Sequence, residues 1–362
     1  MGAGEADHHK TDWRSQIAMN RQALTSFRIT NGVNRSPSSS ARYLRIILWL
    51  AIPIVMWWVM KDFSLREIGE HLSRISIEAA LVLIGLNGII LLLYSSRWWL
   101  ILRTQGMQRS YLALAGYRLA AFGVNYFTPG PQFGGEPLQV HLLQKRENVP
   151  TTTAAASVTL DKLIELVINF SFLLVGVMVI LFSGVLTGDS QIEFLILPLG
   201  LLILPLGYLL ALWRARRPIS WISARFTGRF DDSERLKRID LFINTAEGQV
   251  AEFCKQNPGT LLTAAVMSIL IWGLMVFEFS LMLRFLGVQV SLTKVLIALT
   301  AVRIAFLLPM PAGLGMLEAG QVLAMGLIGV NPALGVSLSL LIRIRDVIFG
   351  GLGLWLGGVL SR

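Results

Sequence analysis

Between two apolar segments lies the stretch Thr128-Pro129-Gly130-Pro131-Gln132-Phe133-Gly134-Gly135-Glu136. A second stretch repeats its pattern further along the chain: Met310-Pro311-Ala312-Gly313-Leu314-Gly315-Met316-Leu317-Glu318. Glu136 and Glu318 are 318 − 136 = 182 positions apart, and further identical residues share this offset without a gap. These further pairs are Pro129/Pro311, Gln139/Gln321, Val140/Val322, Pro150/Pro332 and Ser157/Ser339. Identities at one fixed offset predict a duplicated unit.

Composition indicates an all-α polytopic integral membrane protein. Of the 362 residues, 54% are hydrophobic and only 15% are charged, and several apolar runs approach the length that crosses a bilayer. The net charge of +10 does not indicate nucleic-acid binding, because the basic residues gather in a few polar segments, as in cytoplasmic loops of membrane proteins. A single cysteine, Cys254, excludes an intrachain disulfide and a thiolate metal cluster. We expect no cofactor and no metal.

The chain divides into a polar tail and one membrane domain. Residues 1–42 lack hydrophobic periodicity and are predicted to be a disordered cytoplasmic tail. Residues 43–360 form the predicted transmembrane domain, with repeat cores at about 110–186 and 292–360. Within it, residues 214–258 form a polar cytoplasmic loop, whose apolar residues recur at the spacing of amphipathic helices on the inner leaflet.

We predict about six full transmembrane helices and two re-entrant helical hairpins. The full spans begin near Tyr43, Glu78, Ala154, Phe194, Leu261 and Ala333. The hairpins cover 111–143 and 292–330, each with its Pro/Gly stretch at a tip buried in protein. The alternative for the first hairpin is two complete spans with a short outer turn, but its second piece of about 13 residues is short for a span.

An odd number of spans separates the two hairpins, so they are expected to open toward opposite sides of the membrane. This arrangement is an inverted repeat, which in transporters places the substrate site near the midplane at broken helices. Basic residues flank the ends of the chain and predict that both termini are cytoplasmic.

Charged residues within the apolar segments are the candidate site. Each would cost on the order of 3 kcal/mol against lipid, so we expect them to face a shared polar interior. The candidate substrate-binding residues are Arg118, Glu136, Gln139, Asp161, Lys162, Glu165, Arg303, Glu318, Arg343 and Asp346. Glu278 and Arg345 are further predicted buried charges. For any single residue, the alternative is an ion pair that only fixes the fold. Arg97 is interpreted as an interfacial anchor with a snorkelling side chain.

The two glutamates directly follow the Pro/Gly stretches, so they fall at the starts of short helices. There a carboxylate complements the helix dipole, and the free N–H groups suit an anion such as a lipid phosphate. Arg118 and Arg303 precede the stretches and suit phosphate. Both signs in one cavity favour a zwitterionic headgroup. The sequence has no G-x-x-x-x-G-K-[ST] loop and thus no predicted ATPase, which leaves passive movement and proton coupling open.

These motifs resemble a known family. Gly134-Gly135-Glu136 with Leu142-Leu143, then Asp161-Lys162-Leu163-x-Glu165, then Pro311-Ala312-Gly313-Leu314-Gly315-x-x-Glu318, are similar to the flippase-like family of the lysylphosphatidylglycerol synthase transmembrane region. The resemblance covers about residues 43–360 and includes no synthase domain, so we expect that activity to be absent. It implies translocation of a phospholipid or polyprenyl-linked lipid across the plasma membrane of a bacterium or archaeon. Gln139 and Lys162 stand where arginine is commoner, which leaves the headgroup open.

Two other functions compete with lipid flipping. One is an integral-membrane enzyme that uses a lipid phosphate, although the short outer loops carry no paired-carboxylate or histidine-rich motif. The other is a scaffold for a partner lipid-modifying enzyme or glycosyltransferase, with the basic loop as its docking surface. The expected partners are membrane lipids and not nucleic acid, and the sequence does not predict an oligomeric state.

Overall fold

The computed structural model describes residues 76–127, 134–184, 193–227, 234–307 and 315–361, which are helical and contain no strand. The chain falls into two units, residues 1–46 and 47–362, and every described residue belongs to the second. The predicted tail, the predicted span from Tyr43 to Met60 and most of both Pro/Gly stretches lie outside the described residues. For the described ranges, the prediction of an all-α protein is confirmed.

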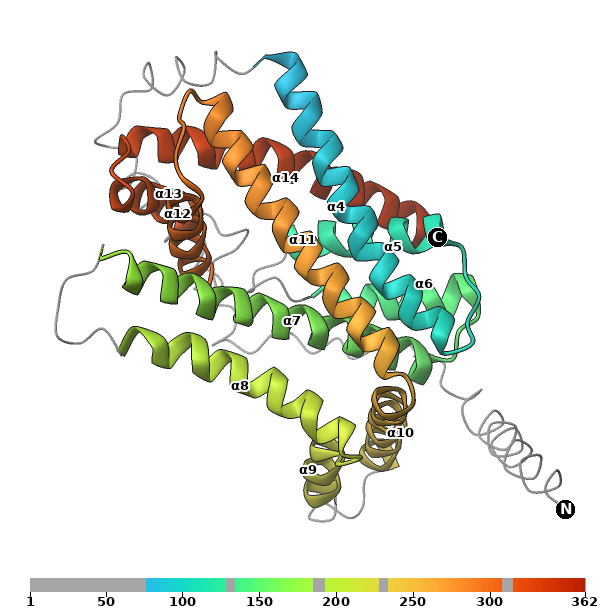
Figure 1. Ribbon diagram of the computed structural model, residues 1–362. Helices are drawn as coiled ribbons and strands as arrows, with labels where there is room; N and C mark the ends of the chain where they lie inside the picture. Colours follow the sequence, from blue (N-terminus) through green and yellow to red (C-terminus); the bar gives the residue numbers. More distant parts are fainter. Residues whose placement is uncertain (1–75, 128–133, 185–192, 228–233, 308–314, 362) are drawn as a thin grey trace, which may run out of the picture. The chain divides into compact units, whose positions relative to one another are not determined.

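Four helices are long and apolar enough to cross a membrane. They are α4 (Ile77–Thr104), α7 (Thr151–Phe182), α8 (Glu193–Trp213) and α11 (Pro258–Phe285), shown in Figure 1. Each contains a window with mean hydropathy of at least 2.2, as expected of segments whose solvent is lipid. They lie where four of the predicted full spans were placed. α14 (Pro332–Ser361) is also long, but it carries three charged residues near its middle.

Two pairs of short helices flank the Pro/Gly stretches. The first pair is α5 (Tyr111–Phe127) and α6 (Glu136–Glu147), and the second is α12 (Leu292–Ala305) and α13 (Met316–Leu327). The members of each pair pack against each other. α5 has the predicted bounds, whereas α6 continues one turn beyond the predicted Leu143 and ends at Glu147. The next residue, Asn148, has a left-handed backbone that terminates the helix.

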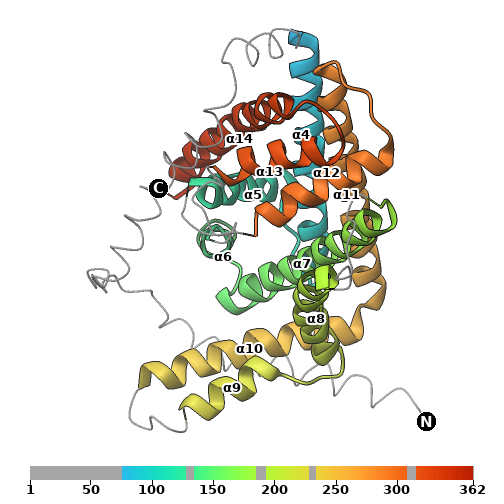
Figure 2. The same cartoon turned by 90° about the vertical axis from the view of Figure 1, so that its left-hand side faces the viewer.

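Glycines allow the short helices to cross the long ones closely. α5 packs along α14 (Figure 2), where a Cβ added to Gly353 would lie 2.1 Å from the carbonyl oxygen of Leu119. α12 packs on α7, where a Cβ added to Gly176 would lie 1.9 Å from the hydroxyl oxygen of Thr300. Small residues are the usual means by which helices approach within membranes. These crossings bring the two short pairs onto the long helices.

The polar loop forms two helices, as its amphipathic pattern predicts: α9 (Pro218–Thr227) and α10 (Glu234–Gln256). Glu247 of α10 accepts hydrogen bonds from the backbone N–H groups of Ile219 and Ser220, at 3.0 and 2.6 Å, and so satisfies the start of α9. Phe253 and Cys254 are buried in the cluster that joins α10 to α7 and α8. The location of the two helices on the inner leaflet stays a prediction.

Candidate functional site

A cavity of about 340 Å³ lies among the described helices α4–α7 and α11–α14. Ten charged residues line it, five basic and five acidic: Arg118, Lys162, Arg303, Arg343, Arg345, Glu136, Asp161, Glu165, Glu278 and Asp346. The formal charges of the lining therefore balance. The cavity also falls within the size range of small-molecule sites in proteins.

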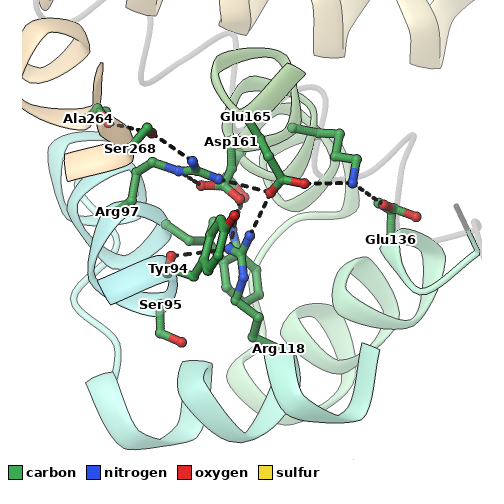
Figure 3. Close-up of polar contacts among 12 residues, drawn as sticks. Tyr94, Ser95, Arg97, Arg118, Glu136, Asp161, Glu165, Ala264 and Ser268 are labelled. Carbon is green, nitrogen blue, oxygen red and sulfur yellow. Dashed lines mark hydrogen bonds and ion pairs between the residues drawn. The ribbon is translucent and has the colours of Figure 1, made fainter. Parts of the chain in front are cut away.

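The largest group of charges is centred on Arg97 of α4, whose side chain is fully buried (Figure 3). The guanidinium donates to Asp161 at 2.6 Å, to Glu165 at 3.2 Å and to the hydroxyl of Ser268 at 2.8 Å. Arg118 of α5 reaches the same two carboxylates, at 2.8 and 3.1 Å. Asp161 and Glu165 can share two arginines because they lie one turn apart on one face of α7.

Lys162 links this group to the start of α6. Its ammonium lies 2.9 Å from one oxygen of Glu165 and 3.3 Å from Glu136. Arg97, Arg118, Lys162, Glu136, Asp161 and Glu165 are called the α4–α7 ionic cluster below. Its three cations and three anions are mutually bonded, which offsets the cost of removing each from water.

A second ion pair anchors the other short helix. Arg343 of α14 donates to both carboxylate oxygens of Glu318, at 2.9 and 3.2 Å. Glu318 also accepts a hydrogen bond from the backbone N–H of Gly315 at 2.8 Å, so the same carboxylate caps α13. Glu136 makes a similar contact, because it accepts a hydrogen bond at 2.9 Å from the N–H of Gly134, two residues before the start of α6.

A third group of charges joins α4, α11 and α14. Arg345 lies 2.5 Å from Glu278 and 2.7 Å from its neighbour Asp346. Asn87 of α4 donates to Glu278 at 2.7 Å. Two carboxylates and one guanidinium leave this group with one formal negative charge.

Arg303 of α12 differs from the other cations that line the cavity. Its guanidinium carbon lies 4.7 Å from the ring centroid of Trp272, and one nitrogen lies 3.9 Å from the sulfur of Met275. In the described ranges it forms no ion pair with a carboxylate. The cation–π contact orients the side chain but supplies no hydrogen-bond acceptor oxygen.

Two glutamines also line the cavity, Gln139 of α6 and Gln321 of α13. They are repeat counterparts, because they are separated by the same 182 positions as the two glutamates. Gln321 is fully buried, and neither its amide oxygen nor its amide nitrogen has a hydrogen-bond partner within the part of the chain that the structure describes. Buried amides are normally satisfied, so Gln321 needs an explanation.

Nine of the ten predicted site residues line this one cavity. The exception is Glu318, which does not line the cavity but forms an ion pair with Arg343, which does. The prediction for Arg97 is wrong: its guanidinium does not snorkel to an interface but lies buried between two carboxylates. The sequence held a signal for a third buried cation, because three predicted carboxylates, Glu136, Asp161 and Glu165, outnumber the two predicted cations Arg118 and Lys162.

Sequence reasoning did not select Gln321, Tyr94 or Asn125, which also line the cavity. The repeat offset could have pointed to Gln321 through Gln139. No group of three histidine, cysteine, aspartate or glutamate residues suited to a metal ion occurs in the described ranges.

Comparisons with known proteins match most of the chain. The family model for the lysylphosphatidylglycerol synthase TM region matches residues 45–353. A UPF0104 membrane protein of Pyrococcus horikoshii is 23% identical over 328 residues, covering 84% of this chain and 92% of the relative. One from Methanocaldococcus jannaschii is 24% identical over 321 residues, covering 84% of this chain and 90% of the relative. One from Methanothermobacter thermautotrophicus is 23% identical over 289 residues, covering 77% and 84% respectively.

Proposed function

The chain belongs to the family of the lysylphosphatidylglycerol synthase transmembrane region, and we propose that it moves a phospholipid or polyprenyl-linked lipid between membrane leaflets. The lipid headgroup passes through the charged cavity while the chains stay in the bilayer. The protein acts in the plasma membrane with both termini in the cytoplasm, and it catalyses no covalent step.

One observation carries this proposal: a cavity lined by five basic and five acidic residues lies among helices of which three, α4, α7 and α11, are apolar enough to cross a membrane. Each buried charge is costly in hydrocarbon, on the order of 3 kcal/mol. A fold that only needed stability could use apolar side chains at these positions, since replacing buried ion pairs by apolar residues is often neutral or stabilising. A polar path for a headgroup explains why both signs are retained.

Helix contacts support the duplicated architecture. Under the offset of 182 positions, the segment from α5 to α7 corresponds to the segment from α12 to α14. α6 packs on α7 as α13 packs on α14, and α5 packs on α14 as α12 packs on α7. This exchange of contacts is expected of two repeats related by a pseudo-twofold axis, an arrangement that transporters use to expose one site to both sides.

The helix ends support hairpins that open in opposite directions. Lys145 and Arg146 at the end of α6 donate to carbonyls in the last turn of α14, so the first hairpin ends beside the end of α14. The hydroxyls of Thr104 and Thr260, 3.4 Å apart, join the end of α4 to the start of α11. α5 follows α4 directly and α12 follows the far end of α11, so the two pairs start from opposite ends of the antiparallel helices α4 and α11.

The ion pairs suit a headgroup that carries charge. A passing cation can be received by carboxylates such as Glu136 and Glu165, and a passing anion by arginines such as Arg303. The carboxylates can exchange a protein partner for the headgroup, whereas Arg303 has no carboxylate partner to give up, and both lower the cost of leaving water without fixing the lipid in place. We therefore propose a zwitterionic or anionic lipid as the substrate.

The test is lipid movement by the purified protein in vesicles of defined composition. Fluorescent phosphatidylglycerol, phosphatidylethanolamine and a polyprenyl phosphate are reconstituted separately, and dithionite quenches the fluorophores exposed outside. We expect the protein to make nearly all of at least one lipid accessible within minutes, whereas protein-free vesicles protect the inner leaflet. Arg238→Gln, a substitution at an exposed position of α10, controls for effects of purification and reconstitution. If the protein moves none of these lipids, the flippase proposal fails and an enzyme or scaffold role replaces it.

A further inference from the structure

We infer that Arg303 of α12 and Gln321 of α13 form the subsite for a phosphate oxyanion inside the cavity. This inference rests on the proposed lipid function and assigns one part of the cavity to one part of the substrate. It differs from the sequence-based prediction, in which Arg118 and Arg303 were equivalent phosphate ligands.

The partners of the two arginines separate their roles. Arg118 is bonded to Asp161 and Glu165 at 2.8 and 3.1 Å, so its charge is already compensated. Arg303 forms no ion pair with a carboxylate among the described residues, and the nearby Glu278 and Asp346 are paired with Arg345. Its guanidinium carbon lies over the indole of Trp272, 4.7 Å from the ring centroid. A guanidinium that is not paired with a carboxylate keeps its planar set of N–H donors for other acceptors, and these donors match the oxygens of a phosphate. Arg303 is therefore the cation that is prepared for an anion from outside the protein.

Gln321 supplies an independent observation at the same cavity. Its side chain is fully buried, lines the cavity, and has two unpartnered amide atoms within the described part of the chain. A polar ligand that enters the cavity would satisfy them. The amide N–H can donate to a phosphate oxygen, and the carbonyl oxygen can accept from a neighbouring hydroxyl or ammonium.

The backbone around Gln321 cannot easily move the amide away. A Cβ on Gly335 of α14 would lie 2.6 Å from the carbonyl carbon and oxygen of Gln321, and one on Gly320 would lie 2.8 Å from the Cβ of Ala305 in α12. The backbone of α13 is thus clamped between α12 and α14 at this position. Gly320 also faces Val302 of α12, so the two helices are in close contact next to Gln321, and the Gln321 and Arg303 side chains line the same cavity.

The rest of this wall suits the junction of a headgroup and its chains. Apolar lining residues gather on α11, α12 and α13, and they include Met275, Phe279, Leu299, Val302, Phe306 and Leu317. The α4–α7 ionic cluster lies on other helices, and all of its members except Arg97 line the same cavity. In a lipid the phosphate joins the apolar chains to the polar headgroup. A phosphate at Arg303 and Gln321 therefore directs the remainder of the headgroup toward the carboxylates of the cluster.

The experiment measures binding, and it does so without transport. Purified protein in detergent is titrated with dihexanoyl phosphatidylglycerol, with dihexanoylglycerol, which has the same chains but no phosphate, and with sodium phosphate. The readout is the thermal stabilisation of the protein. We expect the phospholipid to stabilise wild type at concentrations at least tenfold lower than dihexanoylglycerol. Stabilisation by sodium phosphate at similar concentrations would identify free phosphate as a ligand of the same subsite, whereas its absence identifies the lipid.

Two variants and one control localise the effect. Gln321→Leu removes both unpartnered amide atoms while keeping an apolar side chain of similar size, so we expect a folded protein with at least tenfold weaker phospholipid binding. Arg303→Gln should weaken binding by a similar or larger factor. Gln105→Leu is the matched control, because the amide oxygen of Gln105 is also buried without a partner but Gln105 does not line the cavity.

The outcomes separate this inference from the proposed function. Unchanged phospholipid binding in a folded Gln321→Leu protein overturns the subsite even if the protein moves lipids. Equal binding of dihexanoylglycerol and the phospholipid by wild type overturns it too. Loss of binding in both variants supports the subsite even if vesicle experiments show no lipid movement, in which case it is the flippase proposal that fails.

Discussion

Glu136 and Glu318 make the same two contacts in the two halves of the chain. Each carboxylate accepts a hydrogen bond from a glycine N–H just before its own helix, and each pairs with a cation on the long helix that follows. They differ in burial, because the side chain of Glu136 is 23% exposed and that of Glu318 only 4%. One carboxylate faces the cavity, whereas the other supports a cation that faces it.

This difference predicts unequal effects on stability. Glu318→Gln leaves Arg343 without its carboxylate in a buried place, and breaking such a pair costs about 3–5 kcal/mol. Glu136→Gln loosens a longer, partly exposed contact, and we expect a loss of about 1 kcal/mol or less. Thermal unfolding of the purified variants should show a much larger drop in midpoint for Glu318→Gln.

The double variant Glu318→Gln/Arg343→Met provides the control for that prediction. It removes the stranded cation, so it should recover part of the stability that Glu318→Gln loses. Equal midpoint shifts for the two single variants would contradict the assigned burial of Glu318.

The crossing of α5 and α14 gives a second prediction. In Gly353→Ala, the new Cβ would lie 2.1 Å from the carbonyl oxygen of Leu119, so the helices must separate. We expect a loss of about 1–3 kcal/mol in the free energy of unfolding, the usual cost of overpacking, which thermal unfolding would measure. Gly351→Ala on the same helix meets nothing within 4 Å and should be neutral or stabilising by up to about 1 kcal/mol, because alanine favours helix. The idea of a tight crossing fails if both variants behave alike.

The buried position of Arg97 gives a third prediction. Arg97→Met removes three hydrogen bonds and leaves Asp161 and Glu165 with a single arginine partner. We expect most of this variant to aggregate or to elute as a broad peak in size-exclusion chromatography. Arg103→Met, an exposed position on the same helix, should elute like wild type. A monodisperse Arg97→Met protein of normal stability would show that the α4–α7 ionic cluster does not hold these helices together.

Local sequence patterns were sufficient to predict the helices but not the pairing of the charges. α5 has the predicted bounds because a proline and glycine stretch ends an apolar run, and both signals are local in sequence. Arg97 was misjudged because its carboxylate partner Asp161 lies 64 positions away. Its burial depends on how α4 meets α7, which no local pattern contains.

The same limit applies to the predicted residues of the cavity. Charges in apolar segments predicted that a shared polar interior exists, since each charge alone would be too costly. The sequence could not show that Arg118 is paired with two carboxylates whereas Arg303 lies over the ring of Trp272. It also could not show that Gln321 has no partner in the described ranges, because that depends on how α13 packs between α12 and α14.

The final prediction concerns the sidedness of the two short helix pairs, and the native cysteine makes it simple to test. Cys254 is buried, and burial raises the pKa of its thiol to about 11. The reactive thiolate is therefore scarce at neutral pH, so folded wild type should not react with a membrane-impermeant maleimide. Full labelling after denaturation in detergent would show that the fold protects the thiol from the maleimide. Single cysteines can then be introduced without a cysteine-free background.

Four positions at helix ends report the sidedness: Gln144, Gln256, Gln289 and Val330. The proposed topology places Gln144 at the end of α6 and Gln256 at the end of α10 on the cytoplasmic side, because basic residues flank both. Gln289 precedes α12 and Val330 follows α13, so cysteines there should be labelled on intact cells, whereas the first two should be labelled only after the membrane is opened. Labelling of Gln144→Cys on intact cells would mean that α5 and α6 cross the membrane as a full pair. Labelling of Gln289→Cys without Val330→Cys would mean the same for α12 and α13, and either result would remove the inverted repeat on which exposure of one site to both sides depends.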